Sequence, residues 1–344
     1  MTYEIEARTL HFKQPAGTSR GVYTTRKIWL VHLYEGDCHG VGECAPLPDL
    51  SCDAMGDEAY ISILNKVCEV FCQKGEIDDD TLRDYPSMLF GLETALLDVR
   101  CKKDARRGLL FDTAFSRGEV GIPINGLVWM GNYEEMLKRM ESKLEQGFRC
   151  VKLKIGAIDF DQELDLIKRI RSRFSFHEIE LRLDANGAFP YEDALYKLEL
   201  LSQYAIHSIE QPIRQGQWAY MAELCRESPL PIALDEELIG VNDLAMKRHM
   251  LNIIKPRYII LKPSLHGGMA GCREWIDTAR EMGIGSWITS ALESNIGLNA
   301  IAQFASSVYG DHVTMPQGLG TGLLFTDNIP MPLEIRGDQL WRCH

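Results

Sequence analysis

Charged residues stand at the ends of several short apolar segments in the second half of the chain. The segment "VKLKIG" (Val151 to Gly156) puts two lysines on one side of a strand and three aliphatic residues on the other, because successive strand residues point to opposite faces. The segments "LRLDANG", "SIEQPI", "IALDEEL" and "IILKPS" continue this pattern, which places five charged residues in phase: Lys154, Asp184, Glu210, Asp235 and Lys262. Their intervals are 30, 26, 25 and 27 residues, each about one strand plus one helix. We therefore expect the five side chains to meet at one end of a parallel sheet.

The three acids of this set would form an all-oxygen site. Without histidine or thiolate ligands they favour a hard cation, Mg²⁺ first and Mn²⁺ as the alternative. Lys154 and Lys262 would approach the metal from opposite sides. A lysine works as a base near neutral pH only when its charged form is disfavoured, and the ammonium of Lys152 would have that effect on Lys154. Such a site suits removal of a proton beside the carboxylate of a small-molecule substrate, because the metal stabilises the enediolate.

Simpler explanations exist for each residue alone. A strand-end acid can cap the next helix, and a lysine can extend to solvent. Five in phase are harder to explain in this way, because unpaired charge inside a barrel costs several kcal/mol per ion. A Schiff-base lysine of a metal-free aldolase would not require three converging acids. A barrel that binds metal without catalysis would not require two lysines aimed at it.

Repeated strand and helix units follow residue 121. Amphipathic stretches such as "YEEMLKRMESKLEQG" precede short apolar ones such as "FRCVKLKIG", a texture typical of parallel strands with right-handed crossovers. We predict strands at 122–128, 150–155, 179–184, 206–210, 231–235, 258–262, 285–290 and 312–315. Eight units favour a (β/α)8 barrel, whose active site lies at the carboxyl ends of the strands. An open doubly wound sheet is the alternative, but no G-x-G-x-x-G follows the first strand.

The first 120 residues have a different texture. Residues 3–12 and 27–43 predict antiparallel strands, the second set turning at "EGD". Apolar residues at helical spacing predict helices from Asp53 to Cys72 and in "PSMLFGLETALLDVRCKK". This part is predicted to be a small α+β domain.

Composition excludes several classes of partner. The chain has 37 lysines and arginines against 49 acids, and its formal charge of −12 gives no reason to bind nucleic acid or an anionic membrane. No apolar run approaches the roughly 18 residues of a transmembrane helix, and no signal peptide is recognisable, so we expect a cytoplasmic protein. Ten scattered cysteines predict free thiols. A zinc site at Cys38, His39, Cys44 and Cys52 is disfavoured by its irregular spacing.

Five motifs together resemble a known family. In order and spacing, "VKLKIG", "LRLDANG", "IEQPI", "LDEEL" and "LKPS" resemble the enolase superfamily, in its muconate-lactonizing-enzyme subgroup. The resemblance implies an α+β capping domain over residues 1–121, a (β/α)-barrel catalytic domain over 122–322, and a C-terminal segment over 323–344 that returns to the capping domain. Within the subgroup, "TSRG", "GVGECAPLPDLS" and "ITSALESNIG" are most similar to the o-succinylbenzoate synthase family of menaquinone biosynthesis.

This resemblance implies an activity. The reaction would be a Mg²⁺-dependent syn dehydration of 2-succinyl-6-hydroxy-2,4-cyclohexadiene-1-carboxylate to o-succinylbenzoate, through α-proton abstraction and an enediolate. The three acids would bind the metal, and Lys154 would take the proton and return it to the departing hydroxyl. Lys262 would hold its ammonium near the ring of the intermediate. Lys152 and Asn186 would support this set.

Substrate recognition would come from both domains. The resemblance implies that Ser19 and Arg20, with the "ECAPLPDLS" loop, close over the mouth of the barrel. Ser290 and Glu293, at the end of the seventh predicted strand, would contact the succinyl arm.

Two further residues are placed by strand alternation. Arg182 has the same parity as Asp184, and would either reach a substrate carboxylate or form a deep structural ion pair. Glu236, next to Asp235, is expected to point to the opposite face and to support the site rather than bind the metal.

Other reactions of the subgroup remain alternatives. Racemases and dipeptide epimerases use the same five residues, with the two lysines acting on opposite faces of the substrate. Dipeptide epimerases resemble one another in an Asp-x-Asp pair near the eighth strand, where this chain has "PQGLGTGLLF". The difference argues against dipeptides and leaves an N-acylamino acid racemase as the alternative function. No sequence feature indicates an oligomeric state.

Overall fold

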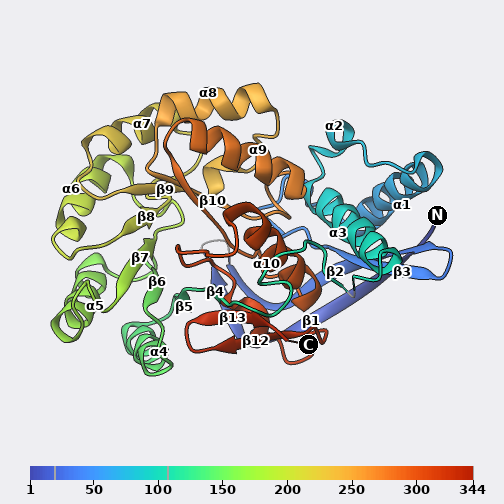
Figure 1. The fold of residues 1–344 in the computed structure, drawn as a ribbon. Helices are drawn as coiled ribbons and strands as arrows, with labels where there is room; N and C mark the ends of the chain where they lie inside the picture. Colours follow the sequence, from blue (N-terminus) through green and yellow to red (C-terminus); the bar gives the residue numbers. More distant parts are fainter. Residues whose placement is uncertain (19–20, 107, 344) are drawn as a thin grey trace.

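The computed structural model describes residues 1–18, 21–106 and 108–343 (Figure 1). The chain opens with an antiparallel sheet in the order β1 (Thr2–Thr18), β2 (Gly21–Glu35) and β3 (Cys38–Cys44). The predicted turn at "EGD" joins β2 to β3, where Gly36 has a φ of 58°. This is a left-handed conformation that glycine adopts without steric cost.

Helices cover one face of this sheet. They are α1 (Asp57–Lys74), the short α2 (Asp79–Leu82) and α3 (Pro86–Lys103). The predicted apolar stripe of α3 is buried, namely Met88, Leu92, Ala95, Leu96 and Val99. β3 approaches α3 so closely that a Cβ on Gly42 would lie 1.8 Å from the carbonyl oxygen of Gly91. The glycines of "GVGEC" are therefore required by the close contact between strand and helix.

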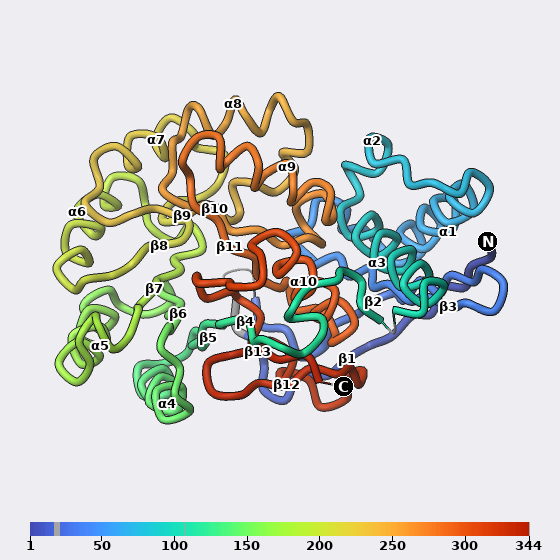
Figure 2. The backbone as a smooth tube through the Cα atoms, viewed as in Figure 1, coloured from blue at the N-terminus to red at the C-terminus, as the bar shows by residue number. Residues whose placement is uncertain are grey.

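Seven parallel strands form the second sheet, and consecutive strands are neighbours in it. The strands are β5 (Gly126–Val128), β6 (Cys150–Lys154), β7 (Glu180–Asp184), β8 (Ser208–Glu210), β9 (Ile232–Leu234), β10 (Tyr258–Leu261) and β11 (Gly285–Ile288). The helices that connect and follow them are α4 (Tyr133–Glu145), α5 (Phe160–Arg173), α6 (Tyr191–Ser202), α7 (Trp218–Glu227), α8 (Leu244–Ile254), α9 (Gly268–Glu281) and α10 (Asn295–Tyr309). Figure 2 shows α4 to α9 around the outside of the curled sheet. The fold is the predicted (β/α)8-type barrel with an N-terminal α+β domain.

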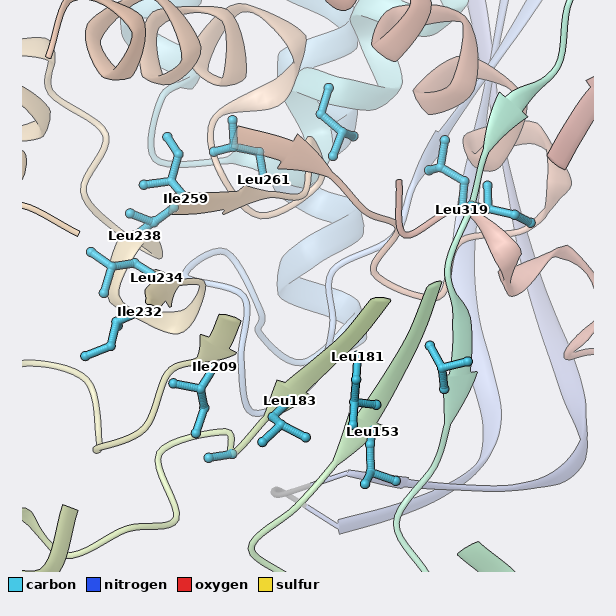
Figure 3. Close-up of a cluster of buried hydrophobic side chains, with 14 of the residues drawn as sticks. Leu153, Leu181, Leu183, Ile209, Ile232, Leu234, Leu238, Ile259, Leu261 and Leu319 are labelled. Carbon is cyan, nitrogen blue, oxygen red and sulfur yellow. The ribbon is translucent and has the colours of Figure 1, made fainter. Parts of the chain in front are cut away.

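Alternation along the strands separates a helix-facing layer from the barrel interior. Val151, Leu153 and Ile155 are at most 1% exposed and belong to the main hydrophobic core. Leu153 pairs in register with Leu183 of β7, and Figure 3 shows the matching leucines and isoleucines of the neighbouring strands gathered in one cluster. The residues between them, which include both lysines of "VKLKIG", therefore project into the barrel.

The barrel closes differently from the prediction. The predicted eighth strand at 312–315 is wrong, because these residues form no strand. Instead, Gln317 forms an isolated bridge with Ile124, and Gly318 forms one with Thr289, so that two single bridges join the edges of the sheet. The proline and glycines of "MPQGLGTG" explain this, because neither residue type supports a regular ladder. A short 3₁₀ helix, η2 (Gly320–Leu323), follows.

The first predicted strand, 122–128, is divided in two. Its first part, β4 (Ile122–Pro123), leaves the barrel and pairs with β13 (Gln339–Arg342), which also pairs with β12 (Leu333–Arg336). The C-terminal segment contacts β1 as well, since Lys13 N donates to Leu324 O and Thr326 N donates to His11 O. The domain boundaries at 121 and 322 stay predictions.

Two carboxylates of the N-terminal part cap barrel helices. Glu43, at the end of β3, accepts hydrogen bonds from Ser294 N at 2.8 Å and from Gly297 N at 2.9 Å, at the start of α10. Glu93 of α3 accepts from Met269 N at 2.6 Å in the first turn of α9. Because helix N-termini carry partial positive charge, both contacts join the N-terminal part to the barrel favourably.

Two expectations from composition can be compared with the structure. All ten cysteines are free thiols, as predicted. Within the ranges described above, no helix is both long and apolar enough to cross a membrane.

Candidate active site

The strands bring the five predicted charged residues to one end of the barrel. Lys154, Asp184 and Glu210 are the last residues of β6, β7 and β8, and each is in register with the next. Asp235 and Lys262 directly follow β9 and β10. The spacing of 25 to 30 residues therefore corresponds to successive parallel strands whose carboxyl ends meet at one edge.

Lys152 lies two residues before Lys154 on β6, and its amine forms ion pairs with two of the acids. Its Nζ is 2.8 Å from Asp184 Oδ2 and 2.5 Å from Glu210 Oε2, and its side chain is 14% exposed. Burial alone would lower the pKa of Lys152, but Asp184 and Glu210 outweigh burial and raise it. Lys152 is thus held as a cation between two carboxylates. Its effect on Lys154 stays a prediction.

Lys154 lines the cavity, and its amine begins a chain of hydrogen bonds. Its Nζ donates to Asp184 Oδ2 at 2.9 Å and to Asn186 Oδ1 at 2.7 Å. Asn186 Nδ2 donates in turn to Glu236 Oε1 at 2.9 Å. Asn186 has a φ of 45°, a left-handed conformation that asparagine tolerates better than most residues. Asn186 is therefore placed to orient the amine of Lys154, and its supporting role stays a prediction.

Lys262 lies on the other side of the acids. Its Nζ pairs with Asp235 Oδ2, and its backbone N–H donates to His266 Nδ1 at 2.8 Å. Burial lowers the pKa of His266 to about 3, so this imidazole stays neutral and accepts the hydrogen bond. Burial alone would also lower the pKa of Lys262, but Asp235 and Glu210 raise it. Lys262 is therefore held as a cation that faces Lys154 across the acids.

Negative charge exceeds positive charge in this cluster. Three lysines face four carboxylates, those of Asp184, Glu210, Asp235 and Glu236. Burial alone would raise the pKa of Asp184, but two lysines lower it, whereas burial and repulsion from Asp184 raise that of Glu210. One further positive charge would let all four acids ionise together.

Unpaired oxygens support the same conclusion. Glu210 Oε1, Asp235 Oδ1 and Glu236 Oε2 are buried without a hydrogen-bond partner, which is costly for carboxylate oxygens. Their chemistry fits Mg²⁺. In the present arrangement the lysines lie between the acids, and no three His, Cys, Asp or Glu side chains of the described ranges converge closely enough to enclose an ion. The zinc cluster that the sequence disfavours is likewise not formed there.

A cavity of about 1000 Å³ opens above the lysines. Lys152, Lys154, Lys262, Asp184, Asn186 and Glu236 line its inner end. Tyr23, Leu47 and Leu50 line it from the N-terminal part, and Trp287 and Ser290 line it from the barrel. Both parts of the chain therefore shape the space for a substrate.

The other residues that were predicted to contact substrate differ in whether they line the cavity. Ser19 and Arg20 lie outside the described residues. Ser290 lines the cavity and shares a hydrogen bond of 2.6 Å with Thr321 Oγ1. Glu293 is fully buried, accepts from Ala291 N and Ser264 Oγ, and does not line the cavity. It is therefore placed to hold its own loop rather than a substrate.

Arg182 takes the structural alternative. It is 2% exposed, its Nε donates to Glu180 Oε1 at 2.7 Å, and its Nη1 donates to Pro316 O at 2.9 Å. Its guanidinium lies 4.4 Å from the ring centroid of Trp287, which lines the cavity, whereas Arg182 does not. Arg182 therefore forms an ion pair in which its own side chain is buried and that of Glu180 is 32% exposed.

Sequence alternation missed two cavity residues. Glu236 was expected to point away, but β9 ends at Leu234 and the 3₁₀ helix η1 (Glu236–Leu238) turns Glu236 toward Asn186. Trp287 carries no charge that would mark it as a site residue, although alternation within "GSWIT" places it inside the barrel. An indole on the floor gives the cavity a flat apolar surface suited to a ring.

Comparisons with known proteins identify the family of this chain. The family described as "Enolase C-terminal domain-like" matches residues 135–337, and the one described as "MenC, N-terminal domain" matches residues 18–99. An o-succinylbenzoate synthase of Desulfotalea psychrophila is 46% identical, over 96% of this chain and 96% of the relative. The L-Ala-D/L-Glu epimerase of Bacillus subtilis is 25% identical, over 84% of this chain and 79% of the relative.

Solved structures show the same fold. The crystal structure of MenC from Desulfotalea psychrophila LSv54 has a TM-score of 0.81 and 41% identity, and the match covers 98% of this chain and 99% of that one. Muconate lactonizing enzyme from Pseudomonas fluorescens, complexed with muconolactone, has a TM-score of 0.82 at 22% identity, covering 99% and 93%. The second match supports the architecture alone.

Proposed function

Because the chain belongs to the enolase superfamily and, within it, to the family of o-succinylbenzoate synthases, we propose that it dehydrates 2-succinyl-6-hydroxy-2,4-cyclohexadiene-1-carboxylate to o-succinylbenzoate. The observation that carries this proposal is the opposed pair Lys154 and Lys262 on either side of buried carboxylates at the barrel mouth. Removal of a proton beside a carboxylate requires a base and a source of positive charge for the oxygens, and this site offers both.

Lys154 is the proposed base. Its amine takes the proton from the ring carbon that bears the carboxylate, and the electron pair of the broken C–H bond enters the ring system. The same nitrogen then returns the proton to the hydroxyl group on the adjacent carbon, which leaves as water while the ring becomes aromatic. One base on one face of the ring gives a syn elimination. The hydrogen bond from Lys154 to Asn186 orients the amine for both transfers.

Asp184, Glu210 and Asp235 would hold Mg²⁺, with Mn²⁺ as the alternative. When bound, the metal supplies positive charge to the carboxylate oxygens that become more negative as the proton leaves. Lys262 presents its ammonium to the opposite side of the substrate, where it stabilises the electron-rich ring. Trp287 and the cavity walls exclude water from the ring.

Other details of recognition are proposals as well. Ser290 and Thr321 would donate hydrogen bonds to the succinyl arm, because both line the cavity beside each other. Ten free thiols support a reducing compartment, and we propose the cytoplasm.

An ultraviolet assay with freshly generated cyclohexadiene substrate tests the function. We expect native protein to form the aromatic product only with Mg²⁺, and Lys154→Ala to lose at least about 10³-fold in kcat because the proton has no acceptor. Lys103→Ala, which removes an exposed lysine paired with Glu35, is the control and should keep full activity. A folded native protein without turnover would contradict the assignment.

An N-acylamino acid racemase is the second candidate. The opposed lysines would serve it equally well, since each could exchange a proton with one face of an α-carbon. Deuterium exchange at the α-carbon of N-succinyl amino acids distinguishes the two. Exchange that requires both Lys154 and Lys262, in a protein that does not dehydrate the cyclohexadiene, would favour the racemase.

A further inference from the structure

Arg26 of β2 joins two loops that are far apart in the sequence. It is only 3% exposed. Its Nη1 donates to Pro46 O at 2.5 Å, and its Nη2 donates to Ala45 O at 2.6 Å. On the other side, its Nε donates to Leu292 O at 3.2 Å, and its Nη2 reaches Ala291 O at 3.4 Å. A single guanidinium therefore ties residues 45–46 of the N-terminal part to residues 291–292 of the barrel.

Both loops form walls of the substrate cavity. Leu47 and Leu50 follow the first pair of carbonyls, and Ala291 and Leu292 carry the second pair; all four residues line the cavity. Leu292 has a φ of 65°, a left-handed conformation that costs energy for a branched residue and persists only where its surroundings impose it. The hydrogen bond from Arg26 to its carbonyl is one such constraint.

The geometry requires an arginine. These hydrogen bonds all end on main-chain carbonyl oxygens, which accept from a planar fork of donors pointing in different directions. A lysine carries the same charge on a single nitrogen and cannot reach both loops in this way. Glu43 and Glu293 lie near enough to stabilise the buried charge.

We propose that Arg26 is a positioning residue that sets the shape of the substrate cavity by clamping the 45–50 loop against residues 291–292. The inference rests on the proposed function for its kinetic consequence. Arg26 contacts neither lysine nor any of the proposed metal ligands, so its loss should weaken substrate binding while proton transfer by Lys154 stays intact.

Arg26→Lys tests the clamp, and Arg171→Lys is the matched control. Arg171 donates to the carbonyls of Tyr204, Ile179 and Ala205 at 2.8 to 2.9 Å, and none of these three residues lines the cavity. We expect Arg26→Lys to raise KM by about tenfold, as for the loss of one hydrogen bond to a charged group, with kcat within about threefold of native. Arg171→Lys should leave KM unchanged even if it lowers the thermal midpoint.

Hydrogen exchange provides a readout that does not depend on activity. Arg26→Lys should increase exchange of the amides in residues 45–52 and 289–293, whereas Arg171→Lys should increase exchange only around residues 171–181 and 203–206. Unchanged KM and unchanged exchange in the two cavity loops would overturn the clamp, and so would a loss of kcat at constant KM. If the native protein does not dehydrate the substrate, the proposed function fails, and the exchange pattern alone decides the clamp.

Discussion

Substitution of Lys152 by methionine removes the cation that bridges two buried carboxylates. Lys152 Nζ lies 2.8 Å from Asp184 and 2.5 Å from Glu210, and the two acids are 0% and 2% exposed. Methionine keeps most of the side-chain volume, so the change acts on charge more than on packing. The variant would leave Asp184 with Lys154 as its remaining cation and Glu210 with none within ion-pair distance among the described residues.

The expected cost follows from this geometry. Removal of one partner from a buried ion pair destabilises a protein by about 3 to 5 kcal/mol, because the remaining charge stays buried. For 344 residues, an unfolding entropy of about 2.1 cal/mol/K per residue gives about 0.7 kcal/mol/K. The thermal midpoint should therefore fall by about 4 to 7 °C in the presence of a chelator. Saturating Mg²⁺ should recover part of this loss, because the freed carboxylates bind the added cation.

Thermal unfolding of native protein and Lys152→Met, each in chelator and in Mg²⁺, measures both effects. Lys103→Met is the control, because Lys103 forms a pair with Glu35 at 2.9 Å that is exposed to solvent and therefore contributes little to stability. A deficit no larger than that of the control would refute the claim that Asp184 is buried and ionised and that Lys152 balances its charge. A native protein whose thermal midpoint is the same in chelator and in saturating Mg²⁺ would refute the metal assignment.

Two further predictions concern other buried charges. Burial raises the pKa of Glu43 to about 7, above its unfolded value of about 4.5. Between these two pH values the folded protein holds a proton on Glu43 that the unfolded chain releases. The contribution of protonated Glu43 to the free energy of unfolding is therefore complete below pH 4.5 and is lost as the pH rises through 7. Thermal midpoints across pH 5 to 8 should therefore fall less steeply for Glu43→Gln than for native protein, and parallel curves would contradict this. Arg182→Met should lower the midpoint by several degrees, because it leaves Glu180 without its buried partner, and should change KM by less than about tenfold. A larger rise in KM at constant stability would instead show that Arg182 contacts substrate.

The proposed catalytic lysines and metal-binding acids could be predicted because strand geometry is regular. A side-chain period of two and a unit of about 30 residues place Lys154, Asp184 and Glu210 at neighbouring strand ends, whatever the connecting helices contain. Beyond the last residue of a strand, alternation no longer predicts the direction of a side chain. Glu236 follows β9 by two residues, and the 3₁₀ turn there reverses the direction that alternation predicts. The missing eighth strand has the same origin, since bridges at Gln317 and Gly318 depend on contacts with distant residues rather than on local periodicity.

Substrate choice depends on features that no local pattern encodes. The cavity walls come from segments more than 200 residues apart, such as Leu47 and Leu292, and their separation is fixed by Arg26 on a third segment. An arginine in the middle of a strand gives no sign in the sequence that it will donate to carbonyls of two loops. The acids and lysines specify proton transfer beside a carboxylate, which dehydratases and racemases share. The shape of the cavity must therefore distinguish these reactions, and the residues that set this shape are the ones to exchange between relatives of different activity.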